Sequence, residues 1–161
     1  HKGKVYPLEQ MAEVVRLFFE SHPHGRLFVF GSRKEMEMLR PTWGKGFERL
    51  AFVCDILKGL DAELQLMARL NAMVSMDSGN MHLASLVDCP VVSIWGQTHP
   101  FAGFMGYHQA EENVVQQDLH CRPCSIFGNA PCRYGDFRCL RDILPQLIID
   151  KVEEIISPEQ D

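Results

Sequence analysis

The chain has 161 residues, of which 46% are hydrophobic, and a formal net charge of −5 at pH 7. This length and apolar content suit one domain with a buried core, whereas the acidic balance without a basic stripe argues against nucleic acid as a partner. No stretch approaches the roughly 18 apolar residues that a membrane-spanning helix needs, and no signal-peptide pattern is present. Six cysteines without secretory features suit a reducing cytosol better than a disulfide scaffold, so we expect a cytoplasmic protein without a transmembrane segment. Since the chain does not begin with Met, we also expect it to be a piece of a longer one.

Apolar periodicity and turn residues divide the first half of the chain into alternating helices and strands. The predicted elements are a helix over residues 8–20, a strand over 27–30, a helix around 36–39 that Pro41 ends, a loop over 42–49, a strand over 50–54, and a helix capped by Asp61 that runs to Leu70.

The stretch from Val74 to Ala84 combines the end of an apolar strand, a tight turn and the start of a helix. Asp77 and Ser78 are good N-cap residues, because their side-chain oxygens accept hydrogen bonds from a first helical turn. Gly79 has no side chain that would keep a ligand away from the backbone. Free amides at a helix N-terminus favour an anion, above all a phosphate, so this turn predicts a phosphate-binding corner.

Another apolar strand, over residues 90–95, follows at once and ends at Gly96. Apolar strands that alternate with helices predict an α/β fold with a Rossmann-like, doubly wound parallel sheet, which binds ligands at the carboxyl ends of its strands. Residues 97–140 are Cys-rich and lack periodicity apart from a strand hint at 113–115, so we expect an irregular, functional segment. Renewed apolar spacing predicts a closing helix over about 142–156.

Candidate ligand-binding residues follow each predicted strand and therefore collect at one edge of the sheet. They are Glu35 after the first strand, Leu60 and Asp61 after the second, Asp77 to His82 after the third, and Gly96 to Thr98 after the fourth. A carboxylate can bind ribose hydroxyls, apolar backbone can cover a base, and helix amides with a lysine can hold phosphates, which together make a nucleotide site. Each residue alone also has an ordinary structural alternative: helix caps for Asp77 and Ser78, a solvated charge for Glu35, and a core histidine for His82.

Three further runs of this chain form a pattern: Asp77-Ser78-Gly79-Asn80-Met81-His82-Leu83-Ala84, then Pro90-Val91-Val92, and Gly96-Gln97-Thr98-His99-Pro100. Together they resemble the signature of glycosyltransferase family 9, the heptosyltransferases. The start of the chain, Lys4-Val5-Tyr6-Pro7, resembles the family's Lys-x-Trp-Pro run with Tyr6 in place of the Trp, and residues 31–35 resemble its Gly-x-x-x-Glu turn. In such enzymes two Rossmann-like domains face each other in the GT-B arrangement. This chain, residues 1–161, resembles the carboxyl-terminal domain, which binds the nucleotide-sugar donor.

The resemblance implies that the donor is ADP-heptose. Lys4 would contact the diphosphate, Glu35 would hold the ribose hydroxyls, and the backbone near Leu60 would meet the adenine. The family transfers the heptose to the lipopolysaccharide inner core, with inversion and without a metal, at the inner face of the inner membrane.

The central turn would hold the reacting end of the donor. By resemblance, Asp77 lies beside the sugar and phosphate, Ser78 and Gly79 give amides to the phosphates, and His82 lies beside them. Fixed dipoles and one cation can stabilise the charge that grows on a departing ADP, so this site fits metal-independent transfer.

The resemblance also implies parts of the enzyme that lie outside this chain. In the family, the aspartate that acts as base on the acceptor hydroxyl belongs to the amino-terminal domain, so we expect no catalytic residue here and no transferase activity from the chain alone. The first strand of the donor domain would precede His1, and an open sheet edge is the expected consequence.

Four cysteines lie within 19 residues, at Cys121, Cys124, Cys132 and Cys139, with His120 adjacent. A structural zinc takes four sulfur ligands in a tetrahedron, and such a site would pin an irregular segment. The first pair has the Cys-x2-Cys spacing of a zinc site, whereas six residues separate the second pair. A structural zinc and reduced thiols packed in a core therefore both stay open.

Two other functions are also compatible with the sequence. A different nucleotide-sugar enzyme on the same two-domain plan, such as an epimerase, would share the donor site. A non-catalytic interaction module stabilised by metal would instead centre on residues 121–139.

Overall fold

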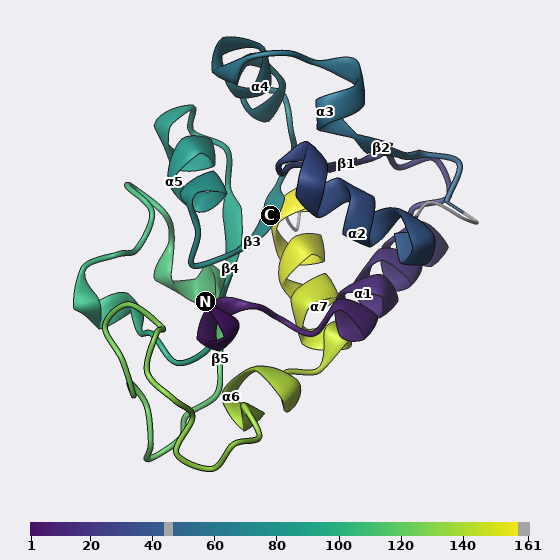
Figure 1. Ribbon diagram of the computed structural model, residues 1–161. Helices are drawn as coiled ribbons and strands as arrows, with labels where there is room; N and C mark the ends of the chain where they lie inside the picture. Colours follow the sequence, from purple (N-terminus) through teal and green to yellow (C-terminus); the bar gives the residue numbers. More distant parts are fainter. Residues whose placement is uncertain (44–46, 158–161) are drawn as a thin grey trace.

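The computed structural model describes residues 1–43 and 47–157, and within them five parallel strands form two sheets. In one sheet β1 (Leu27–Val29) pairs with β2 (Leu50–Phe52); in the other, β4 (Val91–Trp95) lies between β3 (Met73–Met76) and β5 (Val114–Gln116). The described helices are α1 (Leu8–Ser21), α2 (Arg33–Trp43), α3 (Val53–Ile56), α4 (Leu60–Met67), α5 (Gly79–Leu86), α6 (Arg138–Arg141) and α7 (Pro145–Ile156), with short 3-10 helices η1 (Lys2–Lys4), η2 (Pro100–Ala102) and η3 (Glu111–Asn113) (Figure 1).

The central strand of the larger sheet, β4, is buried along its whole length. Because side chains alternate along a strand, Val92 and Ile94 pack on one face with α1 and α7, whereas Val91 and Trp95 pack on the other face with α4 and α5. Figure 1 shows α1 and α7 side by side, away from α4 and α5. Helices on both faces of a parallel sheet define the doubly wound fold, so the predicted fold class is confirmed.

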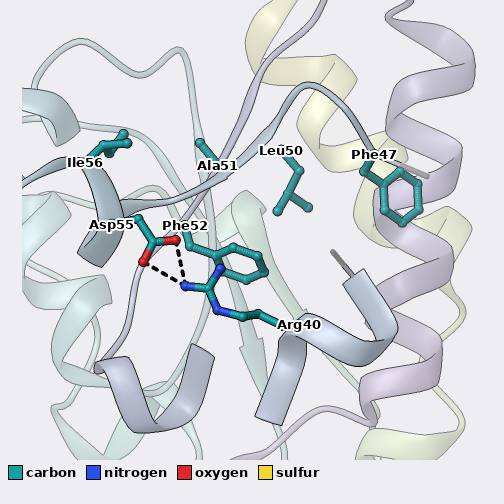
Figure 2. A pocket seen from close by; sticks show the side chains of 7 residues that line it. All are labelled: Arg40, Phe47, Leu50, Ala51, Phe52, Asp55 and Ile56. Atoms are coloured by element: carbon teal, nitrogen blue, oxygen red, sulfur yellow. Dashed lines mark hydrogen bonds and ion pairs between the residues drawn. The ribbon is translucent and has the colours of Figure 1, made fainter. Parts of the chain in front are cut away.

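The smaller sheet packs on α2 through Met36, Trp43 and Phe52. Its outer strand, β2, borders a surface pocket of about 510 Å³. Figure 2 shows the Arg40 guanidinium over the Phe52 ring and turned toward the Asp55 carboxylate, to which Nη2 donates hydrogen bonds of 2.7 and 2.6 Å. The residues that line this pocket include none of the predicted site residues, so the predicted donor site lies elsewhere.

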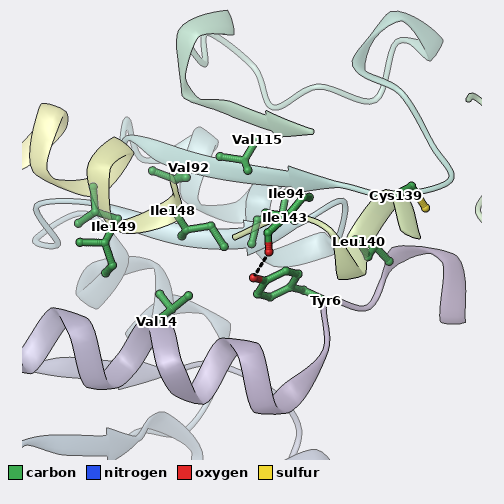
Figure 3. Close-up of a cluster of buried hydrophobic side chains, with 11 residues drawn as sticks. Tyr6, Val14, Val92, Ile94, Val115, Cys139, Leu140, Ile143, Ile148 and Ile149 are labelled. Atoms are coloured by element: carbon green, nitrogen blue, oxygen red, sulfur yellow. Dashed lines mark hydrogen bonds between the residues drawn. The ribbon is translucent and has the colours of Figure 1, made fainter. Parts of the chain in front are cut away.

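Tyr6 fixes the start of the chain in the core between α1, α7 and β4. Its side chain is 1% exposed, and its hydroxyl donates a 2.7 Å hydrogen bond to the carbonyl of Ile143. Figure 3 shows this bond and the apolar side chains around the ring. Burial raises the pKa of Tyr6 to about 12, so the hydroxyl stays a donor at neutral pH and anchors the segment that carries Lys4.

A cavity of about 500 Å³ lies between β1 and β3, and both strands line it together with residues of α1 and α7. The amides of Leu27 and Met73 donate toward the paired strand of each sheet. Because donors alternate along a strand in a parallel pair, the amides of Phe28 and Val74 point toward the cavity. Within the described residues, the expected open edge is thus present on two strands that face each other.

Two boundaries in the first half of the chain differ from the predictions. Pro41 does not end the second helix, because α2 continues to Trp43; a proline in the last turn removes only one internal hydrogen bond. Residues 53 and 54, predicted as strand, instead begin α3. Residues 44–46 of the predicted loop lie outside the described residues.

The starts of two helices, α4 and α7, also differ from the predictions. Gly59, with a φ of +86°, occupies the N-cap position of α4, so Asp61 lies in the first turn and does not cap the helix. The closing helix α7 begins at Pro145, later than the predicted start near residue 142, because a proline suits the first helical position. Among the described helices, none has the length and apolarity that crossing a membrane requires.

Candidate donor-binding site

Lys4 and Asp77 meet just beyond the carboxyl end of β3. The Lys4 Nζ lies 2.8 Å from the Asp77 Oδ2, and the two side chains are 22% and 5% exposed. A buried carboxylate is costly without a partner, and Lys4 supplies that partner. The structure thus joins two residues that lie 73 positions apart and that the sequence placed in one site.

The amides at the start of α5 are not capped by a side chain. Ser78 occupies the N-cap position, but its hydroxyl lies 3.0 Å from the Ser75 Oγ and makes no cap hydrogen bond, so its predicted role as a side-chain cap is wrong. Gly79 is exposed, and a Cβ there would meet nothing within 4 Å. The first turn therefore offers free donors and open space beside Lys4, which is the combination that an anion requires.

His82 lies one turn further along α5 and is exposed. The alternative that it is a core histidine is therefore wrong. Its place on the helix that begins at Gly79 is compatible with a position beside bound phosphates, which stays a prediction.

Glu35 lies in the first turn of α2 and folds back onto Ser32. The Ser32 amide and hydroxyl donate to Glu35 Oε2 at 2.7 and 2.6 Å, and the Glu35 amide donates to Ser32 Oγ at 3.3 Å. The bond from the Ser32 hydroxyl, followed by that from the amide, holds the pKa of Glu35 below its ordinary value. The Ser-x-x-Glu spacing is the sequence signal for this reciprocal cap, so Glu35 is more than a solvated charge.

Leu60 begins α4 and is 52% exposed. The hydrogen bonds and ion pairs found within residues 1–43 and 47–157 connect neither Leu60 nor Glu35 to the Lys4–Asp77 pair. Their proposed contacts with adenine and ribose therefore remain predictions that a bound nucleotide would test.

The irregular segment supplies site residues that the sequence analysis missed. A Cβ on Gly128, which has a φ of +70°, would lie 2.7 Å from the Lys4 Cγ, so the loop backbone packs directly on the lysine stem. The Lys4 Nζ also lies 6.0 Å from the centre of the Phe104 ring, which packs against Phe127. The one sequence signal for this contact is Gly128 itself, because a glycine among larger residues can mark a close approach of another group to the backbone.

The four cysteines of the predicted zinc site are free thiols, of which Cys139 is buried and the other three are half-buried. Over the described ranges, no group of three or more His, Cys, Asp or Glu side chains is placed to hold a metal ion. The Cys124 thiol donates to the Cys121 carbonyl at 2.9 Å. Cys139 is buried in the core, where burial raises the pKa of its thiol to about 11. A structural zinc and reduced thiols without a metal therefore both stay predictions.

Comparison with known proteins adds an independent observation. The model of glycosyltransferase family 9 (heptosyltransferase) matches residues 1–130. The chain is similar to lipooligosaccharide heptosyltransferase 2 of Campylobacter jejuni, with 23% identity over 159 residues that cover 97% of this chain and 48% of the relative. The chain thus spans about half the length of the curated relatives that it matches.

Two solved structures have a similar fold. The E. coli ADP-heptose lipopolysaccharide heptosyltransferase II matches with a TM-score of 0.72 and 22% identity, over 96% of this chain and 42% of that one. The E. coli heptosyltransferase WaaC with ADP matches with a TM-score of 0.67 and 22% identity, over 96% of this chain and 41% of that one. These likenesses confirm the Rossmann-like fold expected for one half of a GT-B enzyme.

Proposed function

Because the chain belongs to glycosyltransferase family 9, the heptosyltransferase family, we propose that it is the donor-binding part of an enzyme that transfers heptose from ADP-heptose. The acceptor is the inner core of lipopolysaccharide, which a further domain of the enzyme binds at the inner face of the membrane. The similar proteins named for heptosyl transfer, for ADP-heptose and for bound ADP support this assignment.

The Lys4–Asp77 pair beside the uncapped start of α5 is the observation that carries the proposal. The Lys4 ammonium gives the diphosphate a positive charge, and the amides of the first turn of α5 donate hydrogen bonds to its oxygens. Asp77 keeps the ammonium in place and faces the sugar side of the donor.

These groups act on the leaving group of the transfer. The bond between the anomeric carbon of the heptose and the β-phosphate oxygen breaks, and its electron pair leaves with ADP. The acceptor hydroxyl oxygen bonds to the opposite face of that carbon, which inverts its configuration, and its proton passes to a base of the further domain. Lys4 and the amides stabilise the charge that develops on ADP, because donors fixed in advance need not reorganise during the reaction.

Calorimetric titration of the chain with ADP, GDP and UDP tests the proposal. We expect ADP to bind best, and we expect Lys4→Met to weaken ADP binding about tenfold, since one charge-assisted hydrogen bond is lost. Lys2→Met, an exposed change in the same short helix η1, is the matched control and should leave the affinity unchanged. A preference for UDP, or equal effects of the two substitutions, would contradict the proposal.

A further inference from the structure

Gln97, the second residue after β4, is fully buried and ties together three parts of the chain. Its backbone amide donates to the Gly3 carbonyl at 2.9 Å, and its backbone carbonyl accepts from the Cys124 amide at 3.0 Å. Its side-chain Nε2 donates to the Ala130 carbonyl at 3.1 Å. One residue therefore holds η1 and both ends of the loop over residues 124–130.

The two segments that Gln97 holds both determine where Lys4 lies: η1 contains Lys4, and the loop over residues 124–130 packs on its side chain. Gly3 directly precedes Lys4, and a Cβ on Gly3 would lie 1.9 Å from the Gln97 Oε1, so the glutamine side chain packs on the backbone there. The loop over residues 124–130 contains Gly128, whose backbone packs on the Lys4 stem. The position of the Lys4 stem is thus set from two directions by contacts that meet at Gln97.

Arg122 fixes Gln97 in turn. Its guanidinium donates to the carbonyls on either side of Gln97, from Nε to Gly96 at 2.5 Å and from Nη2 to Thr98 at 2.9 Å. It also donates to the Gln117 carbonyl beyond β5. The turn that carries Gln97 is therefore held at three consecutive residues and has little freedom to rotate.

We infer that Gln97 is a positioning residue for the donor: it holds the Lys4 ammonium beside Asp77, in the place where the diphosphate of the nucleotide is bound. This inference rests on the proposed function and names a residue that acts on it through Lys4. Without the bond from Gln97 to Ala130, the loop over residues 124–130 stays attached to Gln97 only at Cys124. Gly128 lies near the released end, so its contact with the lysine stem is weakened. The ammonium then gives up more conformational freedom when it binds an anion, and the affinity falls.

Gln97→Met tests this inference, because methionine has a similar length and volume but cannot donate to Ala130. Gln109→Met is the matched control. The Gln109 side chain likewise hydrogen-bonds to the backbone, accepting from Val91 N at 2.7 Å and donating to the Cys89 carbonyl at 3.0 Å, at the opposite end of β4 from Lys4. Both substitutions should lower the melting temperature, whereas only Gln97→Met should weaken ADP binding, about fivefold for one ordinary hydrogen bond.

A double-mutant cycle with Lys4→Met separates positioning from a general structural role. In the Lys4→Met background, Gln97→Met should cause no further loss of ADP affinity, because the residue through which it acts is gone. An ADP affinity of Gln97→Met equal to that of the unsubstituted chain, or a loss that persists in full in the Lys4→Met background, would overturn the inference.

A second substitution covers the case in which Gln97→Met does not fold. Gln97→Asn keeps the amide but is one methylene shorter, so it should no longer reach Ala130 and should give the same pattern in the cycle. Absence of ADP binding by the unsubstituted chain is a distinct result, since it overturns the proposed function and the inference together.

Discussion

Glu35 has two roles at the scale of single residues, one seen in the structure and one proposed. Its Oε2 accepts both hydrogen bonds from Ser32 and completes the cap of α2. Its Oε1 accepts no hydrogen bond from the described residues and is the oxygen that we propose for the ribose hydroxyls. A capping role and a ligand role are compatible, because the cap orients the carboxylate before the ligand arrives.

Glu35→Ala should lower the free energy of unfolding at pH 7 by about 1 kcal/mol or less, since the cap is exposed to solvent. The folded pKa of Glu35 lies below its ordinary value of 4.5, so the stabilisation is complete above that value. It is lost as the pH falls through the folded pKa. Urea denaturation at pH 7 and near pH 3 measures the loss of unfolding free energy that Glu35→Ala causes at each pH. Glu37→Ala, an exposed change on the same helix, is the control; a Glu35→Ala effect independent of pH would contradict the account.

The residues of the donor site differ in how far the sequence could predict them. The resemblance predicted that Lys4 and Asp77 share one site, and the ion pair between them brings the two side chains together; their contacts with a donor stay a prediction. Apolar periodicity could not identify Gln97 or Gly128 as their supports, because the hydrogen bonds and contacts of these two residues join parts of the chain that lie far apart in the sequence. No local periodicity reports such contacts; they depend on how an irregular loop folds back over the sheet.

At the scale of elements, apolar periodicity predicted the strands and the long helices. It did not predict the residues at which helices begin and end, or which strands pair in a sheet. The predicted helix over residues 8–20 matches α1, and the strand hint at 113–115 matches β5. The start of α7 depended instead on Pro145, a local signal that competes with apolar spacing. The division into two sheets could not be predicted from local sequence, because it depends on whether β1 and β3 pair with each other in the folded chain.

The two open edges make a prediction for hydrogen exchange. The amides of Phe28 and Val74 point toward the cavity between β1 and β3, whereas those of Leu27 and Ser75 point toward a paired strand. We expect Val74 to exchange about tenfold or more faster than Ser75, and Phe28 faster than Leu27. Amide exchange measured by NMR checks this, and equal protection within each pair would show that the cavity is filled by hydrogen-bonding groups.

At the scale of the whole molecule, the chain spans about half the length of the curated relatives that it matches, and the chemistry that we propose divides accordingly. The proposed groups act on the donor and on its leaving group, whereas activation of the acceptor is assigned to the other half. The fold class could be predicted because it depends on the order of strands and helices. The donor itself could be predicted only through the family, because no pattern of spacing distinguishes ADP from another nucleoside diphosphate.

The most direct test of the central claim is to map the amide chemical shifts of the chain during titration with ADP. If a diphosphate binds between Lys4 and the start of α5, the largest changes should occur at residues 3–5 and 77–80, with smaller changes at Glu35 and Leu60. Lys4→Met should reduce the changes at residues 77–80 at a given ADP concentration. Changes confined to other surfaces, or none at saturating ADP, would contradict the account.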